Sequence, residues 1–441
     1  MLCLFHQLLN RPSMKPPKSN RRQFLAASGA TAAMVSMPNI LSAQGVKNNK
    51  TLKIGLIGCG GRGTGAASQA LKADPNVKLW AIGDVFESQI PKAVDNLKSF
   101  ADKVDVPAER QFSGLDAYQK VIDSGVDLVL LTAPPAYRPQ HLKAAVEAGK
   151  HVFAEKPMAV DVSGIKSVLE SAKIAKAKGT TIQHGYCWRF SPNTREGYGK
   201  LLSGELGRVV SLYGTYMANV PKPSTAINMR KEEWGDVEWQ LRNWMAHEWL
   251  SGGPLLEQAI HTVDKVAWAM GDVAPIAARA SGGRTQRSDD GNVYDHYDVV
   301  YEYPNGVMCH VAERQMQGVF TEVVDRVFCE NGSLEAPTRV MTKDVTGKIT
   351  WAYRGQPENM YQVCHNEWIA AIRAGEEMNA GEFMANSTML GLLGREAAHS
   401  GQRITWEELW ASNQDLAPDA LKLSDKHPVA PVPIPGTYKF S

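Results

Sequence analysis

The feature that most constrains the fold is the stretch TLKIGLIGCGGRGTGAASQAL at residues 51–71, in which Gly58, Gly60 and Gly63 follow the spacing G-x-G-x-x-G. Apolar residues before it predict a buried strand, and alanines after it predict a helix with an apolar stripe. In that setting Gly58 permits a tight turn, Gly60 lets phosphates approach the backbone, and Gly63 lets helix pack on strand. The stretch therefore predicts a Rossmann-type domain that binds a dinucleotide at the helix N-terminus.

The next strand ends in Asp84, 21 residues after Gly63. A carboxylate there can accept hydrogen bonds from both adenosine-ribose hydroxyls and would repel a 2′-phosphate. We therefore predict NAD rather than NADP as the cofactor, bound by the three glycines, Gly61, Arg62 and Asp84. The alternative is that Asp84 caps the following helix.

Strands and helices alternate beyond this point, with strands predicted over 127–131 and 151–154 and a helix over 140–147. Such alternation is typical of a doubly wound parallel sheet. We assign residues 51–180 to this α/β domain.

The segment SNRRQFL at 19–25 precedes a mildly apolar run rich in alanine, serine and glycine. Paired arginines followed by x-Phe-Leu predict that residues 1–43 are a twin-arginine signal peptide, implying periplasmic export and contact with the twin-arginine machinery. Gly29 and Pro38 make the run a poor membrane span, so no stable membrane anchor is expected. The alternative is an N-terminus that holds two arginines by chance, and Met14 is a second candidate start.

The net charge and the cysteine spacing of the chain argue against several classes of function and site. The formal charge is +2, but residues 1–43 contain five basic and no acidic residues, leaving 43 basic against 46 acidic. No excess of positive charge remains, so nucleic acid is not an expected partner. The five cysteines beyond the leader are widely spaced with no CxxC pair, which predicts neither a disulfide framework nor a metal site.

Residues 181–415 contain strand-like runs with hairpin-type turns at 304–306 and 330–333. They predict a C-terminal α+β domain built on a largely antiparallel open sheet, with helices near 255–270 and 361–374. Because such a sheet tends to bury its outer face against another subunit, we expect a homodimer or homotetramer. The Pro- and Lys-rich segment 416–441 is predicted to be an extended arm over a neighbour.

Three further stretches carry a family resemblance: AGKHVFAEKP at 148–157, YCWRFSPN at 186–193 and SGGPLLEQAIHTVDKVAW at 251–268. With the glycine loop, they make residues 51–415 resemble the glucose–fructose oxidoreductase / inositol dehydrogenase (Gfo/Idh/MocA) family. The resemblance implies a sugar or polyol substrate.

Lys156 follows a predicted strand and so emerges at the carboxyl edge of the sheet, beside the expected nicotinamide. An ammonium there can hydrogen-bond a reacting hydroxyl and stabilise negative charge on its oxygen. The family's lysine at this place is catalytic, and Lys156 matches it. Pro157 permits the cis bond that the family often has here, while the alternative is a solvent-facing lysine beside a turn.

Glu257 and His261 stand four residues apart, which predicts one helical face, and Asp264 follows. The resemblance makes His261 a catalytic acid/base that takes the substrate hydroxyl proton. At the place of Glu257 the family commonly has aspartate, so its role as a catalytic partner of His261 stays open beside a structural or sugar-binding one. Asp264 either orients His261 or caps locally.

The resemblance also assigns binding residues. Thr132 and Pro134 would flank the nicotinamide ribose, Glu155 would contact the cofactor, and His141 would either lie near the dinucleotide or be structural. Candidates to line a sugar pocket are Tyr186, Arg189, Arg242 and His247, accompanied by Trp239, Asn243 and Trp244. Aromatic faces stack on sugar rings and polar groups bind hydroxyls, although for any single tryptophan a place in the core or at an interface is the better explanation.

Together these features predict an exported oxidoreductase that transfers hydride between a secondary alcohol of a sugar, glycoside or cyclic polyol and tightly bound NAD. The twin-arginine route carries folded proteins, so a cofactor acquired inside would have to stay bound. Three alternatives remain: an NAD-dependent glycoside hydrolase of the family 109 type, a non-catalytic sugar or nucleotide binder, and a reductase of imines or tetrapyrrole-like compounds.

Overall fold

The computed structural model describes residues 50–221, 224–418 and 420–440. The predicted signal peptide at 1–43 lies outside these residues. In the described part of the chain, no helix is long and apolar enough to cross a membrane.

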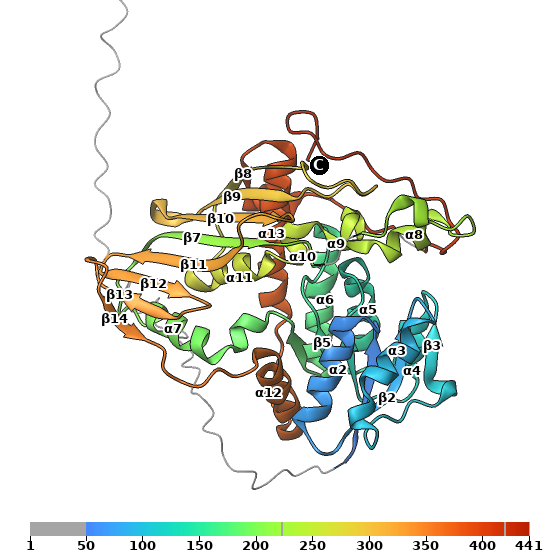
Figure 1. Ribbon diagram of the computed structural model, residues 1–441. Coiled ribbons are helices and arrows are strands. Elements are labelled where there is room, and N and C mark those ends of the chain that lie inside the picture. Colours follow the sequence, from blue (N-terminus) through green and yellow to red (C-terminus); the bar gives the residue numbers. More distant parts are fainter. Residues whose placement is uncertain (1–49, 222–223, 419, 441) are drawn as a thin grey trace, which may run out of the picture. The chain divides into compact units, whose positions relative to one another are not determined.

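The N-terminal sheet has six parallel strands in the order β3-β2-β1-β4-β5-β6 (Figure 1). Its strands are β1 (Leu52–Ile57), β2 (Val77–Asp84), β3 (Gln111–Ser113), β4 (Leu128–Leu131), β5 (His151–Ala154) and β6 (Ile182–His184). Its helices are α2 (Gly61–Ala73), α3 (Gln89–Asn96), α4 (Ala117–Asp123), α5 (Arg138–Glu147) and α6 (Val162–Lys178). The strand order reverses between β1 and β4, and at such a point ligands bind outside the carboxyl ends of the strands.

The second sheet has nine strands in the order β14-β13-β12-β11-β7-β10-β9-β8-β15. They are β7 (Val209–Ala218), β8 (Ala277–Gly283), β9 (His296–Glu302), β10 (Met308–Gln315), β11 (Glu322–Cys329), β12 (Gly332–Ala336), β13 (Met341–Lys343), β14 (Ile349–Ala352) and β15 (Ile404–Thr405). Only β7 and β10 pair in parallel, and the other neighbours are antiparallel. The predicted fold class, a Rossmann domain followed by a largely antiparallel α+β domain, is confirmed.

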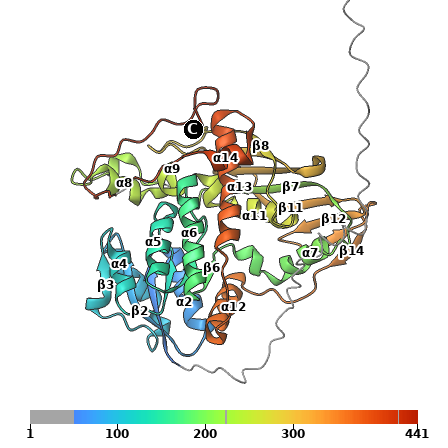
Figure 2. The same ribbon diagram turned by 180° about the vertical axis from the view of Figure 1, so that it is seen from behind.

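The second half of the chain also contains helices, of which some cover the inner face of this sheet and others pack on the first domain or beside it (Figures 1 and 2). They are α7 (Pro192–Leu202), α8 (Asp236–Arg242), α9 (Glu248–Ser251), α10 (Pro254–Glu257), α11 (Ile260–Ala269), α12 (Met360–Ala374), α13 (Gly381–Ser400) and α14 (Trp406–Ala411). Helix α12 packs on α2 beside the glycine loop, and α13 packs against α6, α11 and the strands β8 and β9.

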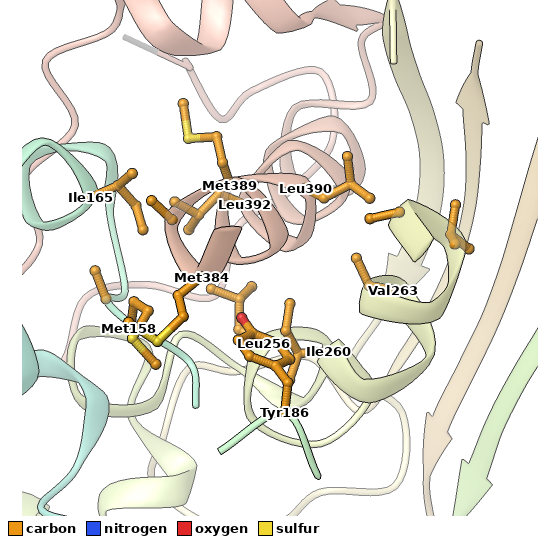
Figure 3. Close-up of a cluster of buried hydrophobic side chains, with 14 of the residues drawn as sticks. Met158, Ile165, Tyr186, Leu256, Ile260, Val263, Met384, Met389, Leu390 and Leu392 are labelled. Carbon is orange, nitrogen blue, oxygen red and sulfur yellow. The ribbon is translucent and has the colours of Figure 1, made fainter. Parts of the chain in front are cut away.

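The core behind the candidate site lies around α13 (Figure 3). Leu256 and Ile260 are fully buried there with Met384 and Leu392 of α13. Gly391 permits this contact, because a Cβ at that position would lie 2.7 Å from Ile260 Cδ1. Close packing of this kind fixes the position of α10 and α11, and therefore of the polar residues on their other side.

The predicted C-terminal arm runs along α8 of its own chain. The amide of Asp236 donates to the carbonyl of Asp425 over 3.0 Å, and that of Glu238 donates to the carbonyl of Leu423 over 3.2 Å. Leu421 and Leu423 of the arm also pack against an apolar cluster that contains Val237 and Leu241 of α8. Paired backbone groups hold the arm in place without a regular strand.

Candidate active site

The glycine loop has the geometry that a dinucleotide requires. Gly58 has φ of +99°, and a Cβ there would lie 2.7 Å from the amide nitrogen of Ala133. A Cβ on Gly63 would overlap the Gly58 carbonyl, so only glycine lets α2 start this close to β1. Beside Gly60 and Gly61, by contrast, nothing lies within 4 Å of a Cβ position. Helix α2 has no side-chain cap and no acidic residue in its first turn, so its free amides and this open space fit a diphosphate.

Asp84 ends β2 beside this loop. Its Oδ2 accepts the Cys59 amide over 2.7 Å and its Oδ1 accepts the Phe86 amide over 2.9 Å. Burial raises the pKa of Asp84, and the two amide bonds oppose that rise. Helix α3 begins only at Gln89 with Ser88 as its N-cap, so Asp84 does not cap it. Each carboxylate oxygen keeps a lone pair, so the group can still accept bonds from ribose hydroxyls.

Thr132 and Glu155 tie the neighbouring strand ends to the loop. The Thr132 hydroxyl donates to the Gly58 carbonyl over 2.8 Å, and Pro134 follows at the start of a short 3₁₀ turn. Glu155 is buried, and its Oε1 accepts Arg62 Nε over 2.6 Å. Burial alone would raise the pKa of Glu155, but the nearby cations, Arg62 first, bring it below its usual value.

Lys156 meets Glu257 where the two halves of the chain face each other. Its Nζ lies 3.3 Å from Glu257 Oε1 and also donates to the Glu257 backbone carbonyl. Both side chains are little exposed, 11% and 13%. The bond before Pro157 is cis, as the resemblance implied.

The single helix predicted over 255–270 is wrong, since α10 ends at Glu257 and α11 begins at Ile260. In a continuous helix the Glu257 carbonyl would accept the His261 amide. Lys156 takes that carbonyl, and the His261 amide bonds to the Gln258 carbonyl over 3.3 Å. The break therefore follows from a contact with a residue about a hundred positions earlier in the chain.

His261 is 9% exposed, and its Nδ1 has no hydrogen-bond partner among the described residues. Burial lowers the pKa of His261 well below its usual value, and the positive charges of Lys156 and Lys265 lower it further. The ring is therefore neutral near neutral pH and can accept a proton. The structure thus brings together a cation, a carboxylate and a neutral imidazole at the carboxyl edge of the first sheet.

Asp264 binds Arg189, and among the described residues no hydrogen bond joins it to His261. Its carboxylate accepts Arg189 Nε over 3.1 Å and Nη2 over 3.0 Å, and the Ser387 hydroxyl over 2.8 Å. Arg189 also pairs with Asp272, so its guanidinium is engaged on two sides. Of the two open roles for Asp264, the structure supports a local, structural one.

Two of the remaining candidates, Tyr186 and His141, lie in the protein interior. Tyr186 is fully buried in the core of Figure 3 and bonds Thr388 Oγ1 over 2.8 Å. His141 is buried against the ring of Tyr118 at 4.2 Å, and burial lowers its pKa to about 3. Both side chains are thus buried, and the Tyr186 hydroxyl already has a partner within the protein.

Arg242 is paired with a protein group, whereas His247 is not. The Arg242 guanidinium pairs with Glu238 and lies 4.1 Å from the ring of Phe86, two residues after Asp84, at the adenosine side of the site. His247 is fully buried, yet neither ring nitrogen has a partner among the described residues, and burial lowers its pKa to about 4. An unsatisfied buried imidazole is rare and marks His247 as a candidate ligand contact.

Two features were missed at the level of sequence. Arg138 is buried behind the strand ends and donates to the Leu131 carbonyl over 2.8 Å and to the Pro157 carbonyl over 3.1 Å. Glu313 lies on β10 at a position whose alternation with Cys309 and Val311 predicts burial. The sequence signal that could have identified Glu313 is a carboxylate at a strand position that is expected to be buried.

Comparisons with known proteins agree with this geometry. A model of the oxidoreductase family with an NAD-binding Rossmann fold matches residues 52–186, and one of the GFO/IDH/MocA C-terminal domain matches residues 200–335. An inositol 2-dehydrogenase/D-chiro-inositol 3-dehydrogenase of Lactiplantibacillus plantarum is 23% identical over 74% of this chain and 84% of the relative. A glycosyl hydrolase family 109 protein of Shewanella pealeana is 27% identical over 35% of this chain and 37% of the relative.

Among solved structures, the aldose-aldose oxidoreductase of Caulobacter crescentus superimposes with a TM-score of 0.63. It covers 81% of this chain and 100% of its own, at 19% identity. This likeness concerns the fold.

Proposed function

Since the chain belongs to the Gfo/Idh/MocA family of NAD-binding oxidoreductases, we propose that it oxidises or forms a secondary alcohol of a sugar, glycoside or cyclic polyol. The observation that carries this proposal is the convergence of Lys156, Glu257 and neutral His261 beside the open glycine loop. The names of relatives, among them inositol dehydrogenases, support the substrate class.

Each of the three residues has a distinct task in this proposal. NAD, when bound, supplies the acceptor for the hydride of the alcohol carbon. His261 takes the hydroxyl proton, because burial and Lys156 keep its ring neutral. Lys156 donates to the alcohol oxygen and stabilises the negative charge that develops on it. Glu257 holds the Lys156 ammonium in place through its carbonyl and carboxylate, which makes it a positioning residue.

A turnover assay tests the proposal. The purified protein, without added cofactor and then with NAD, is mixed with a panel of neutral sugars, glycosides and cyclic polyols. Growth of the reduced-nicotinamide absorbance with substrate is the expected result. Tight sugar binding without any change in the cofactor or substrate would contradict an enzyme and favour the non-catalytic binder.

The glycosidase alternative is separated by the same assay. In that route, oxidation of one carbon would acidify the neighbouring C–H and allow elimination of the aglycone. Addition of water and return of the hydride to the ketone would then leave no net reduced cofactor. The match to a family 109 protein spans about a third of each chain, so this outcome is the second candidate. A glycoside with a coloured aglycone reports it directly.

We also propose export with the cofactor already bound. The paired arginines of SNRRQFL support export. Helix α8 supports retention, because Val85 and Phe86, just after Asp84, pack against the apolar cluster that contains its Val237 and Leu241, as do Leu421 and Leu423 of the arm. NAD that stays with the protein through gel filtration, and secretion that is lost when both arginines become lysine, are the expected results. Purified protein that is free of NAD and binds it weakly would contradict retention.

The outer face of the nine-stranded sheet is the proposed subunit interface. Met308 and Phe328 both pair with Ser211 of β7 and are 38% and 45% exposed, and neighbouring exposed apolar side chains on a sheet face are a feature of oligomer contacts. Sedimentation of the wild type as a dimer or tetramer, and of Phe328→Glu as smaller species, would support it. A monomeric wild type would refute it.

A further inference from the structure

The inner face of the nine-stranded sheet contains buried polar groups that no protein group satisfies. Glu313 is 2% exposed, and neither carboxylate oxygen has a hydrogen-bond partner among the described residues. Gln315, two positions along the same strand, is 5% exposed, and its Nε2 has none either. Buried polar groups are nearly always paired in folded proteins, so two on one face of one strand call for an explanation.

The strand register places Glu313 next to the candidate active site. Glu313 pairs with Tyr216 of β7, so both side chains leave the sheet on the same face. The Tyr216 hydroxyl donates to Gln258 Oε1 over 2.9 Å, and Gln258 Nε2 donates to Glu257 Oε2 over 2.7 Å. A continuous chain of contacts therefore leads from the neighbour of Glu313 to the carboxylate that holds Lys156.

The loop before α9 meets the same region from the other side. His247 has no partner on either ring nitrogen. The positive charge of Arg287 influences the pKa of both His247 and Glu313, so each of these two side chains lies within range of that charge. The Arg287 guanidinium pairs with Asp289 at 2.9 Å, and among the described residues it forms no hydrogen bond with Glu313.

No hydrogen bond to the Glu313 carboxyl group stabilises the fold in the described part of the chain. Burial raises the pKa of Glu313 well above its usual value, Asp295 raises it further, and Arg287 opposes the rise. The group is therefore a neutral carboxylic acid, with one O–H donor and free acceptor capacity. A carboxamide and an imidazole beside it likewise both donate and accept. This combination matches hydroxyl groups, which also donate and accept.

We propose that Glu313, Gln315 and His247 form the far end of the substrate pocket and bind hydroxyl groups remote from the carbon oxidised beside Lys156. The inference rests on the proposed function and deepens it: the substrate is a neutral polyhydroxylated ring. A sugar acid would place its carboxylate against a buried acid with no free cation, which is unfavourable.

The test uses the NAD-loaded full chain and a panel of neutral sugars and polyols, including D-glucose and myo-inositol, with D-glucuronate and D-glucosamine as charged counterparts of glucose. Initial rates give KM and kcat for the wild type, Glu313→Gln and Glu313→Leu. Glu322→Gln is the control, because Glu322 lies on β11, separated from β10 by β7, and its pairing with Met217 places it on the outer face. The melting temperature of each ligand-free variant is measured in parallel.

We expect the best neutral substrate to show a KM raised about tenfold to a hundredfold in Glu313→Leu, as for an unmade buried hydrogen bond, with a smaller rise in Glu313→Gln. The control should keep the wild-type KM, and D-glucuronate should be a poor substrate of the wild type. The ligand-free Glu313→Leu protein should melt no lower than the wild type, because an unpaired buried acid does not stabilise the fold.

Two results would overturn the inference while leaving the proposed function intact. The first is a wild-type KM for neutral substrates in Glu313→Leu. The second is a wild-type preference for D-glucosamine over D-glucose that Glu313→Gln abolishes, since that would make Glu313 the partner of a cationic group. Absence of turnover by the wild type across the whole panel would instead contradict the proposed function, and this inference with it.

Discussion

The glycine loop and the inner face of the nine-stranded sheet satisfy their polar groups in opposite ways. Around the loop, Asp84, Thr132 and Glu155 are each bonded to a neighbouring protein group. By contrast, Glu313 on the sheet face and His247 in the loop before α9 are buried without such partners among the described residues. On our proposal, a substrate supplies on the sheet side the hydrogen-bond partners that these two residues lack.

Lys156→Met should have the largest effect at the junction of the two regions. Losing the donor to the alcohol oxygen is expected to lower kcat about a thousandfold, while NAD remains bound because the loop is unchanged. Turnover and cofactor content are measured together, with Lys173→Met as control, since Lys173 is 72% exposed on α6. Full activity in Lys156→Met would refute its role.

Gly63→Ala tests whether the cofactor side is as tightly built as its contacts indicate. The added methyl would overlap the Gly58 carbonyl, and backbone cannot move aside cheaply, so a loss of about 3 kcal/mol in unfolding free energy is expected. Gly199→Ala is the matched control, because Gly199 is also helical and nothing lies within 4 Å of its Cβ position. Denaturant unfolding of both variants gives the difference, and equal stabilities would contradict the packing argument.

Asp84→Asn tests the preference for NAD. The change keeps the shape but removes the charge, so NAD is expected to bind about tenfold more weakly, as for loss of a charged hydrogen bond. NADP should gain, because the repulsion of its 2′-phosphate is gone. Titration of cofactor-stripped protein with each dinucleotide measures the ratio, and Asp116→Asn, an exposed aspartate, serves as control. An unchanged ratio would remove Asp84 from the ribose site.

The smallest expected effect concerns stability and pH on the sheet face. Because the folded pKa of Glu313 is raised, the folded state binds more protons than the unfolded state above the unfolded pKa. The contribution of Glu313 to the free energy of unfolding is therefore fully present below its unfolded pKa. It falls as the pH rises above that value, and it is lost once the pH passes the folded pKa. The charged neighbours of Glu313, Asp295 and Arg287, stay in place in the variant.

Glu313→Gln should therefore melt a few degrees higher than the wild type at neutral pH and at the same temperature in acid, below the unfolded pKa. Thermal unfolding of both proteins across that range measures the difference. A constant difference at every pH would show that Glu313 does not titrate in this way.

Much of the fold could be predicted from local patterns. The glycine spacing, the strands now seen as β4 and β5, and the hairpin turns near 304–306 and 330–333 depend on neighbouring residues and on alternation. Helix α5 begins at Arg138, two residues before the predicted range, with Pro139 in its first turn. The ends of helices shift in this way because the unpaired backbone groups at a helix end form contacts with other parts of the fold.

The candidate site was harder to predict, because its contacts join distant residues. The break after Glu257 depends on Lys156, and the role of Asp264 depends on Arg189. Tyr186 looked like a pocket residue, yet it packs in the core beneath α13. Residue types alone did not distinguish a side chain that faces a ligand from one that completes a core.

By itself, the sequence determined that this chain has a dinucleotide loop, a parallel sheet and a family-typical lysine and histidine, since each follows from spacing within a short segment. Only the tertiary structure decided which polar groups remain unpaired. Whether Glu313 meets a partner depends on the register of β10 with β7 and on where α10 lies above them. Pairing across such distances is set by packing of the whole fold and not by local propensity.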